Sequence, residues 1–179
     1  RDQSQEGIEI FGGHHVTVSG NTVSNIGNNA IFVQSIASQV PHSDYSDITI
    51  TDNTVDFATN GVLLTTSSDS VNGSMDGADV TVSGNTIRNT TDAGIGLRND
   101  SGSTTDPVIF ARISVTDNTI RMLPGDEGAA KRAAAIFLQN NTGEGETLFS
   151  DIHIDGNHII ATPTTTNFGQ VTIVFYENF

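Results

Sequence analysis

Residues of types that bind or process acidic sugars gather in the middle of the chain. Arg98, Lys131 and Arg132 are cationic, and guanidinium and ammonium groups bind carboxylate or sulfate groups. Asp92 and Asp100 lie near Arg98 in the sequence. Proton abstraction next to a sugar carboxylate requires a base together with a group that neutralises the carboxylate. Asp92, Asp100 and Arg98 are therefore candidate catalytic residues, and the three cations are candidate substrate ligands.

A second reaction, glycoside hydrolysis, needs two carboxyl groups about 5 to 9.5 Å apart across a groove. Asp92 and Asp100 flank one expected strand, and Glu127 lies in a later insertion. Because the chain contains 21 Asp and Glu residues, pairs of this kind also arise by chance. The hydrolase hypothesis stays open beside the first one.

Charge is distributed unevenly along the chain. Seven Lys and Arg residues against 21 Asp and Glu give a net charge of −14, which argues against binding nucleic acid or an anionic membrane through overall charge. Residues 88–132 contain six of the seven cations and six acidic residues, so this segment is neutral overall. It can hold a local site for anionic groups of a polysaccharide. Alternatively, its cations pair with neighbouring acids, as Arg88 would with Asp56 across adjacent strands.

Metal and thiol chemistry find little support in the sequence. The chain has no cysteine, which excludes disulfides, thiolate zinc sites and thiol catalysis. His14 and His15 are adjacent, and neighbouring strand residues point to opposite faces, so we assign them no shared metal ion. Calcium, whose ligands are oxygens, is the one cofactor with candidate ligands. These are Asp69, Asn72, Asp76 and Asp79.

A nine-residue motif occurs five times, and residues 79–87 (Asp-Val-Thr-Val-Ser-Gly-Asn-Thr-Ile) are one copy. Its asparagine recurs at spacings of 32, 32, 33 and 39 residues, as Asn21, Asn53, Asn85, Asn118 and Asn157. A second apolar run follows each copy, at residues 30–34, 61–65, 94–98, 135–139 and 170–174. Apolar and polar residues alternate in both runs, which is typical of strands with one buried face.

A repeat of this length predicts a chain that returns to its starting point after each copy and stacks like residues about 4.8 Å apart. We expect one domain over residues 1–179, with coils near 15–46, 47–78, 79–111, 112–150 and 151–179 and a partial coil at 7–12. Aliphatic columns would fill the interior, and the asparagines would form a ladder. The Gly-Asn or Asp-Asn pair predicts a bend in which the asparagine takes the left-handed conformation.

These repeats resemble right-handed parallel β-helices of the NosD-like class, over nearly the whole chain, through the Val-Thr-Val-Ser-Gly-Asn-Thr-Ile and Gly-Ile-x-Leu runs. The resemblance implies an all-β, right-handed parallel β-helix. The chain is more loosely similar to the catalytic modules of mannuronan C5-epimerases, to polysaccharide lyases and to tailspikes. The epimerase signature Gly-[Phe/Ile]-Asp-Pro-His-[Asp/Glu] is replaced here by Gly-Ile-Gly-Leu-Arg-Asn-Asp at 94–100, so no epimerase catalytic residue is carried over.

The outward positions of the second run form two expected columns. One contains Phe32, Leu63, Gly96 and Phe137, and the other Gln34, Thr65, Arg98 and Gln139. Exposed aromatic rings would bind sugar faces and amides would bind hydroxyl groups. We therefore assign Phe32 and Phe137 to the rings, Gln34, Asn99 and Gln139 to the hydroxyls, and Arg98, Lys131 and Arg132 to the anionic groups. Alternatively, the long loops that follow this run cover the phenylalanines, and the polar residues only solvate the sheet.

The sequence thus favours an extracellular module, on a cell surface or a virion, that binds an acidic polysaccharide and carries lyase or C5-epimerase chemistry if it is an enzyme. The competing class is a structural or adhesive solenoid without catalysis. We expect no nucleic-acid partner and no membrane insertion. Because both ends of a short stack expose strand edges, we expect either flanking coils in a longer chain or assembly with other copies.

Overall fold

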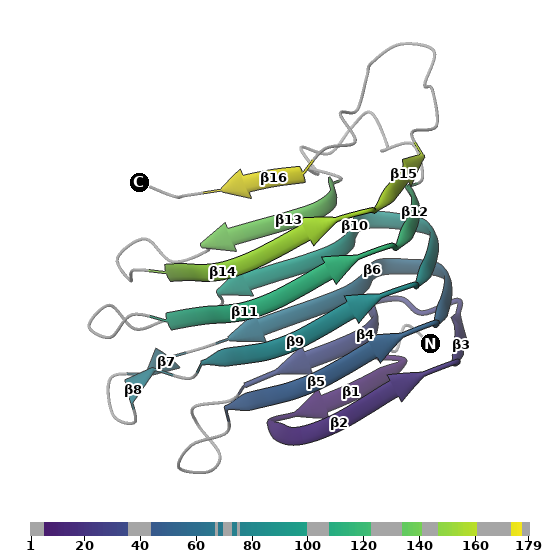
Figure 1. Ribbon diagram of the computed structural model, residues 1–179. Helices are drawn as coiled ribbons and strands as arrows, with labels where there is room; N and C mark the ends of the chain where they lie inside the picture. The colour runs from purple at the N-terminus through teal and green to yellow at the C-terminus, as the bar shows by residue number, and fades with distance from the viewer. Residues whose placement is uncertain are drawn as a thin grey trace.

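The computed structural model describes residues 6–35, 44–66, 68–69, 73–74, 76–99, 108–122, 134–140, 147–160 and 173–176. In these ranges every regular element is a β-strand (Figure 1). The strands are β1 (Ile8–Phe11), β2 (Gly13–Ser19), β3 (Thr22–Ser24), β4 (Asn29–Gln34), β5 (Tyr45–Thr51), β6 (Thr54–Thr66), β7 (Ser68–Asp69), β8 (Gly73–Ser74), β9 (Gly77–Ser83), β10 (Thr86–Asn99), β11 (Val108–Thr116), β12 (Thr119–Met122), β13 (Ala134–Asn140), β14 (Thr147–Asp155), β15 (His158–Ile160) and β16 (Ile173–Tyr176).

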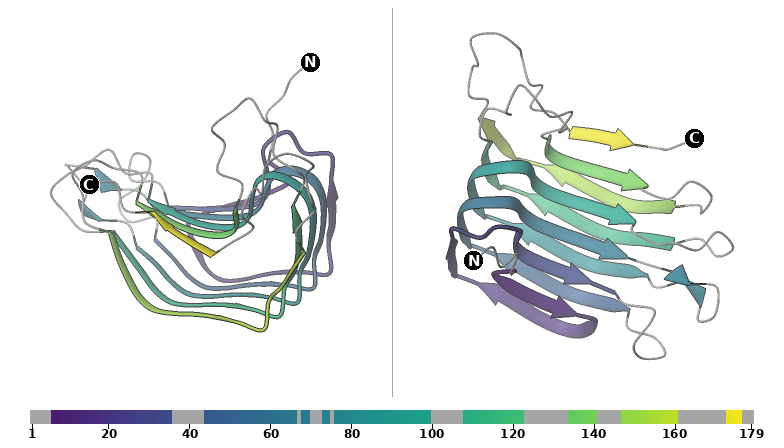
Figure 2. Two further views of the ribbon diagram at one scale, coloured as in Figure 1. Left: turned by 90° about the horizontal axis from the view of Figure 1, so that it is seen from above. Right: turned by 180° about the vertical axis from the view of Figure 1, so that it is seen from behind.

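Two parallel sheets face each other across the core. The first has the strand order β14-β11-β9-β5-β2. The second joins the remaining long strands, with β6 and β10 at its centre, and all its pairings are parallel. The described residues contain one antiparallel pair, the short β7 and β8. Figure 2, left, looks along the stack and shows successive coils lying over one another.

Interior columns of aliphatic side chains hold the coils together. Ile31 is paired with Val62, Val62 with Ile95, and Ile95 with Ile136 in the strand register. All four are fully buried. A second column, from Ile48 through Val80 to Ile113, is equally buried in the other sheet. The columns expected from the repeat are confirmed, and burial of such side chains is the main stabilising contribution to a core.

The predicted asparagine ladder is also confirmed. The Nδ2 amides of Asn21, Asn53, Asn85 and Asn118 each donate to the Oδ1 atom of the asparagine in the next coil, at 2.9 to 3.0 Å. The backbone N–H of each of these four residues donates to the same oxygen. From the second coil onward, Nδ2 also donates to a strand carbonyl of the preceding coil, as Asn85 does to Ile50 at 2.9 Å. The ladder therefore satisfies the polar groups of a buried turn, which would otherwise be costly.

The bend beside the ladder differs from the prediction in one respect. The left-handed residue is the one that precedes each asparagine, with φ values between 55° and 67° at Gly20, Asp52, Gly84, Asp117 and Gly156. The expectation that the asparagine itself takes this conformation is wrong. Its side chain points inward to the ladder, so the preceding residue makes the turn. Glycine and aspartate are among the residues that tolerate it best.

Replacing Gly84 by alanine should cost more stability than the same change at Gly20. Both backbones are left-handed, with φ of 64° and 67°, so each substitution incurs about 1 kcal/mol from conformation alone. A β-carbon at Gly84 would lie 2.7 Å from Asp52 Oδ1, whereas one at Gly20 has nothing within 4 Å. We expect Gly84→Ala to lower the free energy of unfolding by about 1 kcal/mol more than Gly20→Ala, measured by urea denaturation. Equal losses would contradict the contact.

A second left-handed corner turns the chain from the short run after the ladder into the second strand of each coil. Asn25, Phe57 and Asn89 occupy it, with φ values of 58°, 60° and 58°. In the second and third coils the strands β6 and β10 continue through this corner as bent strands. This corner forms an outer edge of the solenoid.

Candidate functional site

The outward face of the second strands is covered, contrary to the expectation of exposed rings. Phe32 and Phe137 are 8% and 5% exposed and pack in a separate apolar cluster with Leu63, Ala93 and Ala134. Phe137 packs against Gly96, where an added β-carbon would meet its ring at 2.5 Å. The predicted binding of sugar faces to Phe32 and Phe137 is therefore wrong for this conformation. Both rings are buried, as the alternative expected, but the long loops that it expected to cover them lie outside the described residues.

The polar row beside this cluster is only partly accessible. Gln34, Arg98 and Gln139 are half-buried, and Arg98 and Gln139 each interact with another group of the protein. Asn99 is fully buried, and its Nδ2 donates to Thr147 Oγ1 at 2.8 Å. Its assignment to a sugar hydroxyl is wrong, because this side chain links the two sheets across the core.

The candidate catalytic residues do not converge in the described structure. The part of β10 that pairs with β13 begins directly after Asp92 and ends directly after Arg98. Six residues of extended strand separate their backbones by roughly 20 Å. Asp92 also interacts with another group of the protein. The described ranges leave out Asp100, Glu127, Lys131 and Arg132, together with most of the long loops that follow the second run.

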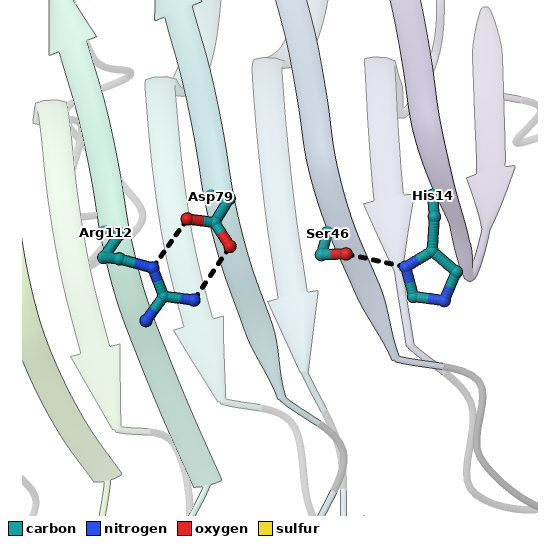
Figure 3. Close-up of polar contacts among 4 residues, drawn as sticks. All are labelled: His14, Ser46, Asp79 and Arg112. Atoms are coloured by element: carbon teal, nitrogen blue, oxygen red, sulfur yellow. Dashed lines mark hydrogen bonds and ion pairs between the residues drawn. The ribbon is translucent and has the colours of Figure 1, made fainter.

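Where the structure describes them, the candidate calcium ligands form hydrogen bonds with other groups of the protein. Arg112 donates to both carboxylate oxygens of Asp79, at 2.6 and 2.8 Å (Figure 3), and these hydrogen bonds lower the pKa of Asp79. Asp76 Oδ1 accepts the backbone N–H of Ile109 at 3.0 Å, and burial raises the pKa of Asp76. Asn72 and the side chain of Asp69 lie outside the described residues. Among the described side chains, no three His, Asp or Glu residues form a group able to hold a metal ion.

His14 and His15 have separate partners. His14 Nδ1 is hydrogen-bonded to Ser46 Oγ at 2.6 Å (Figure 3). His15 Nδ1 contacts the carboxylate of Asp47, one coil along the stack. Each of the two rings thus contacts a different residue of the next coil.

An exposed aromatic ring at the second left-handed corner was not predicted. The side chain of Phe57 is 50% exposed, and Asn25 and Asn89 occupy the same corner in the coils before and after it. Ile26 N–H donates to the Phe57 carbonyl at 2.9 Å, which fixes the stacking of these coils. A shallow hollow of about 300 Å³ lies here, lined by Asn25, Ile26, Gly27, Phe57, Ala58, Thr59, Asn89 and Thr91.

Charged residues lie immediately beside this hollow. Arg88 pairs with Asp56, with 3.7 Å between Nη2 and Oδ2, so that predicted ion pair is confirmed. Asn89 Nδ2 also donates to Asp56, at 2.6 Å. Arg121 lies next to Arg88 in the strand register and is exposed. No ion pair or hydrogen bond joins the Arg121 side chain to another described residue.

The exposed ring at this corner cannot be predicted from strand periodicity. In a regular strand Phe57 would share the face of Val55, which is fully buried, and simple alternation therefore places the ring inside. The left-handed backbone of Phe57 breaks the alternation and turns the ring outward. One signal was present, because Phe57 aligns with Asn25 and Asn89, and asparagine is enriched in this conformation.

Stacked parallel coils, aliphatic columns and an internal asparagine ladder define the class of protein as a parallel β-helix. The family model described as "Right handed beta helix region" matches residues 1–105, more than half of the chain. The chain belongs to the right-handed β-helix family, which confirms the fold predicted from the repeats. No curated protein and no solved structure matches the chain. The described residues include no helix with the length and apolar character needed to span a membrane.

Proposed function

We propose that this β-helix binds an acidic polysaccharide outside the cell, along the corner formed by Asn25, Phe57 and Asn89. The observation that carries the proposal is the half-exposed ring of Phe57 in a hollow whose lining also includes two amide side chains, Asn25 and Asn89, and two hydroxyl side chains, Thr59 and Thr91. An aromatic face packs against the C–H face of a sugar ring. Amide and hydroxyl groups donate and accept hydrogen bonds with the surrounding sugar hydroxyls.

The polar groups of the hollow are placed for a chain-like ligand. Asn25, Thr59, Asn89 and Thr91 come from three successive coils, and coils are about 4.8 Å apart. A linear sugar chain that follows the stack would therefore meet an amide or hydroxyl group at each coil. The ring of Phe57 lies in the middle of this row.

Arg121 and Arg88 support an anionic ligand in preference to a neutral one. Asp56 balances Arg88, while Arg121 has no charged partner among the described residues. A carboxylate or sulfate on the bound chain would bind Arg121, beside Arg88, through charge-assisted hydrogen bonds. The surrounding acidic surface, with a net charge of −14 for the chain, favours recognition through this local contact and not through overall attraction.

Replacing Phe57 by alanine should weaken binding of uronic-acid oligosaccharides by at least tenfold, about 1.4 kcal/mol. The ring is half-exposed, so folding should change little. Isothermal titration with oligouronates of defined length measures the effect. The matched control is Phe11→Ala, because Phe11 is 56% exposed but lies away from the corner. An equal loss for both variants, or no loss for Phe57→Ala, would contradict the proposal.

Replacing Arg121 by glutamine should weaken the binding of acidic oligosaccharides by about three- to tenfold at low salt. The binding of neutral oligosaccharides should not change. Glutamine keeps a hydrogen-bonding group but removes the charge. Arg121→Lys retains the charge and should retain most of the affinity for acidic chains. Titrations at two salt concentrations with matched acidic and neutral oligosaccharides measure the difference. A loss of the same size for neutral sugars would exclude a role for charge.

A structural or adhesive role without sugar binding is the second candidate. The covered rings of Phe32 and Phe137 favour it, because the face predicted to bind sugars is instead occupied by the protein's own apolar cluster. If no acidic or neutral oligosaccharide binds the protein at millimolar concentration, this second candidate replaces the first. Neither candidate assigns a reaction to Asp92 or Arg98.

A further inference from the structure

A column of outward side chains beside the hollow changes its charge from one coil to the next. In the order of the coils, the strand register defines this column as Ser24, Asp56, Arg88, Arg121 and Ile160. Figure 1 shows the strands that carry its charged part, β6, β10 and β12, side by side at one edge of the stack. The column thus has an acid in the second coil and cations in the third and fourth.

A hydrogen bond joins the acid of this column to the hollow. Asn89, which lines the hollow, donates from Nδ2 to Asp56 Oδ1 at 2.6 Å. Because an ionised carboxylate only accepts hydrogen bonds, this contact fixes the amide of Asn89 with its nitrogen toward Asp56 and its oxygen away from it. The polar groups next to the ring of Phe57 therefore include two acceptors, the Asp56 carboxylate and Asn89 Oδ1.

These acceptors determine which sugar can pack on Phe57. A hydroxyl or an N-acetyl amide can donate to them, whereas a sugar carboxylate cannot, because it only accepts. The charge of Asp56 also repels a second anion. Arg88 offsets this repulsion only in part, since its Nη2 lies 3.7 Å from Asp56 Oδ2, which is longer than a hydrogen bond. The sugar on Phe57 should therefore be uncharged.

The third and fourth coils offer the opposite chemistry. Arg88 and Arg121 are exposed neighbours in the strand register, and a guanidinium group only donates hydrogen bonds. Arg121 lies two coils beyond the coil of Phe57, which is roughly 10 Å along the stack. An acidic group bound at Arg121 therefore belongs to a part of the ligand that is separate from the sugar on Phe57.

The overall charge of the chain favours the same kind of ligand. With a net charge of −14, the protein repels each acidic group that does not meet a cation of its own. A chain with an acidic group on each sugar carries several such groups. A chain that alternates acidic and uncharged sugars carries fewer, and it can place one acidic group at the two arginines.

We propose that this corner selects a mixed polysaccharide, in which uncharged sugars separate the acidic ones, over a chain with an acidic group on each sugar. The inference rests on the proposed function and adds the composition of the ligand. Asp56 is the specificity-determining residue, because it repels an anion from the sugar on Phe57 and orients the amide of Asn89. Rejection of the wrong ligand by a like charge is a general source of specificity.

Two tetrasaccharides of the same linkage test the inference. One carries a carboxylate on each sugar, and the other on every second sugar. Isothermal titration at low salt measures their affinities for wild type and for Asp56→Asn, which removes the charge but keeps an acceptor for Asn89. The matched control is Asp79→Asn, because Asp79 also pairs with an arginine of the next coil, Arg112, and its replacement changes the net charge equally. Circular dichroism checks that both variants are folded.

Wild type should bind both tetrasaccharides and prefer the alternating one by about fivefold or more, the effect of one like charge about one coil away. In Asp56→Asn the preference should fall below about twofold, chiefly because the uniformly acidic chain binds more tightly. In Asp79→Asn the preference should match that of wild type.

Three results would overturn the selectivity and leave polysaccharide binding in place. They are equal binding of both chains by wild type, an unchanged preference in Asp56→Asn, and an equal loss of preference in Asp56→Asn and Asp79→Asn, which would assign it to overall charge. If neither tetrasaccharide binds to wild type, the proposed function itself fails, and the inference fails with it.

Discussion

Replacing Asn85 by alanine is expected to lower the free energy of unfolding by about 3 to 5 kcal/mol. The Asn85 Oδ1 atom accepts both the backbone N–H and the side-chain amide of Asn53 at 3.0 Å. Its Nδ2 donates to Ile50 and to Asn118, each at 2.9 Å. Nδ2 also donates to the Ser83 carbonyl at 3.1 Å. Alanine removes all five hydrogen bonds and leaves buried donors and acceptors without partners. The midpoint of urea unfolding, with its slope, measures the loss.

Asn21→Ala is the matched control for the ladder. Asn21 is exposed and accepts no ladder hydrogen bond from a described residue, and its backbone N–H can still donate to Asn53 after the substitution. We expect a loss of about 1 kcal/mol or less. If both variants lose the same stability, the buried ladder does not contribute through hydrogen bonding.

Replacing Gly94 by alanine should cost about 3 kcal/mol. An added β-carbon would lie 2.5 Å from Ile120 Cγ2 and 2.6 Å from the backbone carbonyl oxygen of Ala135 in the next coil. A carbonyl oxygen held in a strand ladder cannot move away without breaking its pairing, so the coils would have to separate. Differential scanning calorimetry gives the change in melting temperature and enthalpy.

Gly96→Ala, two residues further along the same strand, provides the comparison. The atoms nearest to its β-carbon would all belong to side chains, namely the Phe137 ring at 2.5 Å and the Leu63 δ-methyl at 2.8 Å. Side-chain ends can rotate away, so we expect a loss of about 1 kcal/mol or less. A larger loss at Gly96 than at Gly94 would show that the apolar cluster on the outward face is packed more rigidly than the coil interface.

The fold could be predicted because similar residues recur at equivalent positions of every coil. Val80 and Ile113, for example, occupy equivalent repeat positions and are paired neighbours inside the core. The ladder was predictable for the same reason, since Asn53 and Asn85 recur at the coil length. Periodicity thus specifies stacking, because one residue type at one repeat position must serve each coil alike.

The site could not be predicted from periodicity, because it depends on where the chain departs from the repeat. Phe32 and Phe137 alternate correctly as outward residues, yet they pack in a second apolar cluster on that face. Alternation states only which side of a strand a residue faces, not what covers it. Asn99 is fully buried at the end of β10 and points to the other sheet, which depends on the distance between sheets. The exposure of Phe57 depends on one left-handed backbone angle.

The placement of the ligand is the central claim, and chemical-shift mapping of the isotopically labelled protein tests it most directly. Amide spectra would be recorded during titration with an oligouronate. The corner model predicts the largest shifts at residues 25–27, 57–59, 89 and 91, which line the hollow, with smaller shifts near Arg121. Shifts concentrated instead at Gln34, Thr65 and Gln139, or no shifts at all, would contradict it.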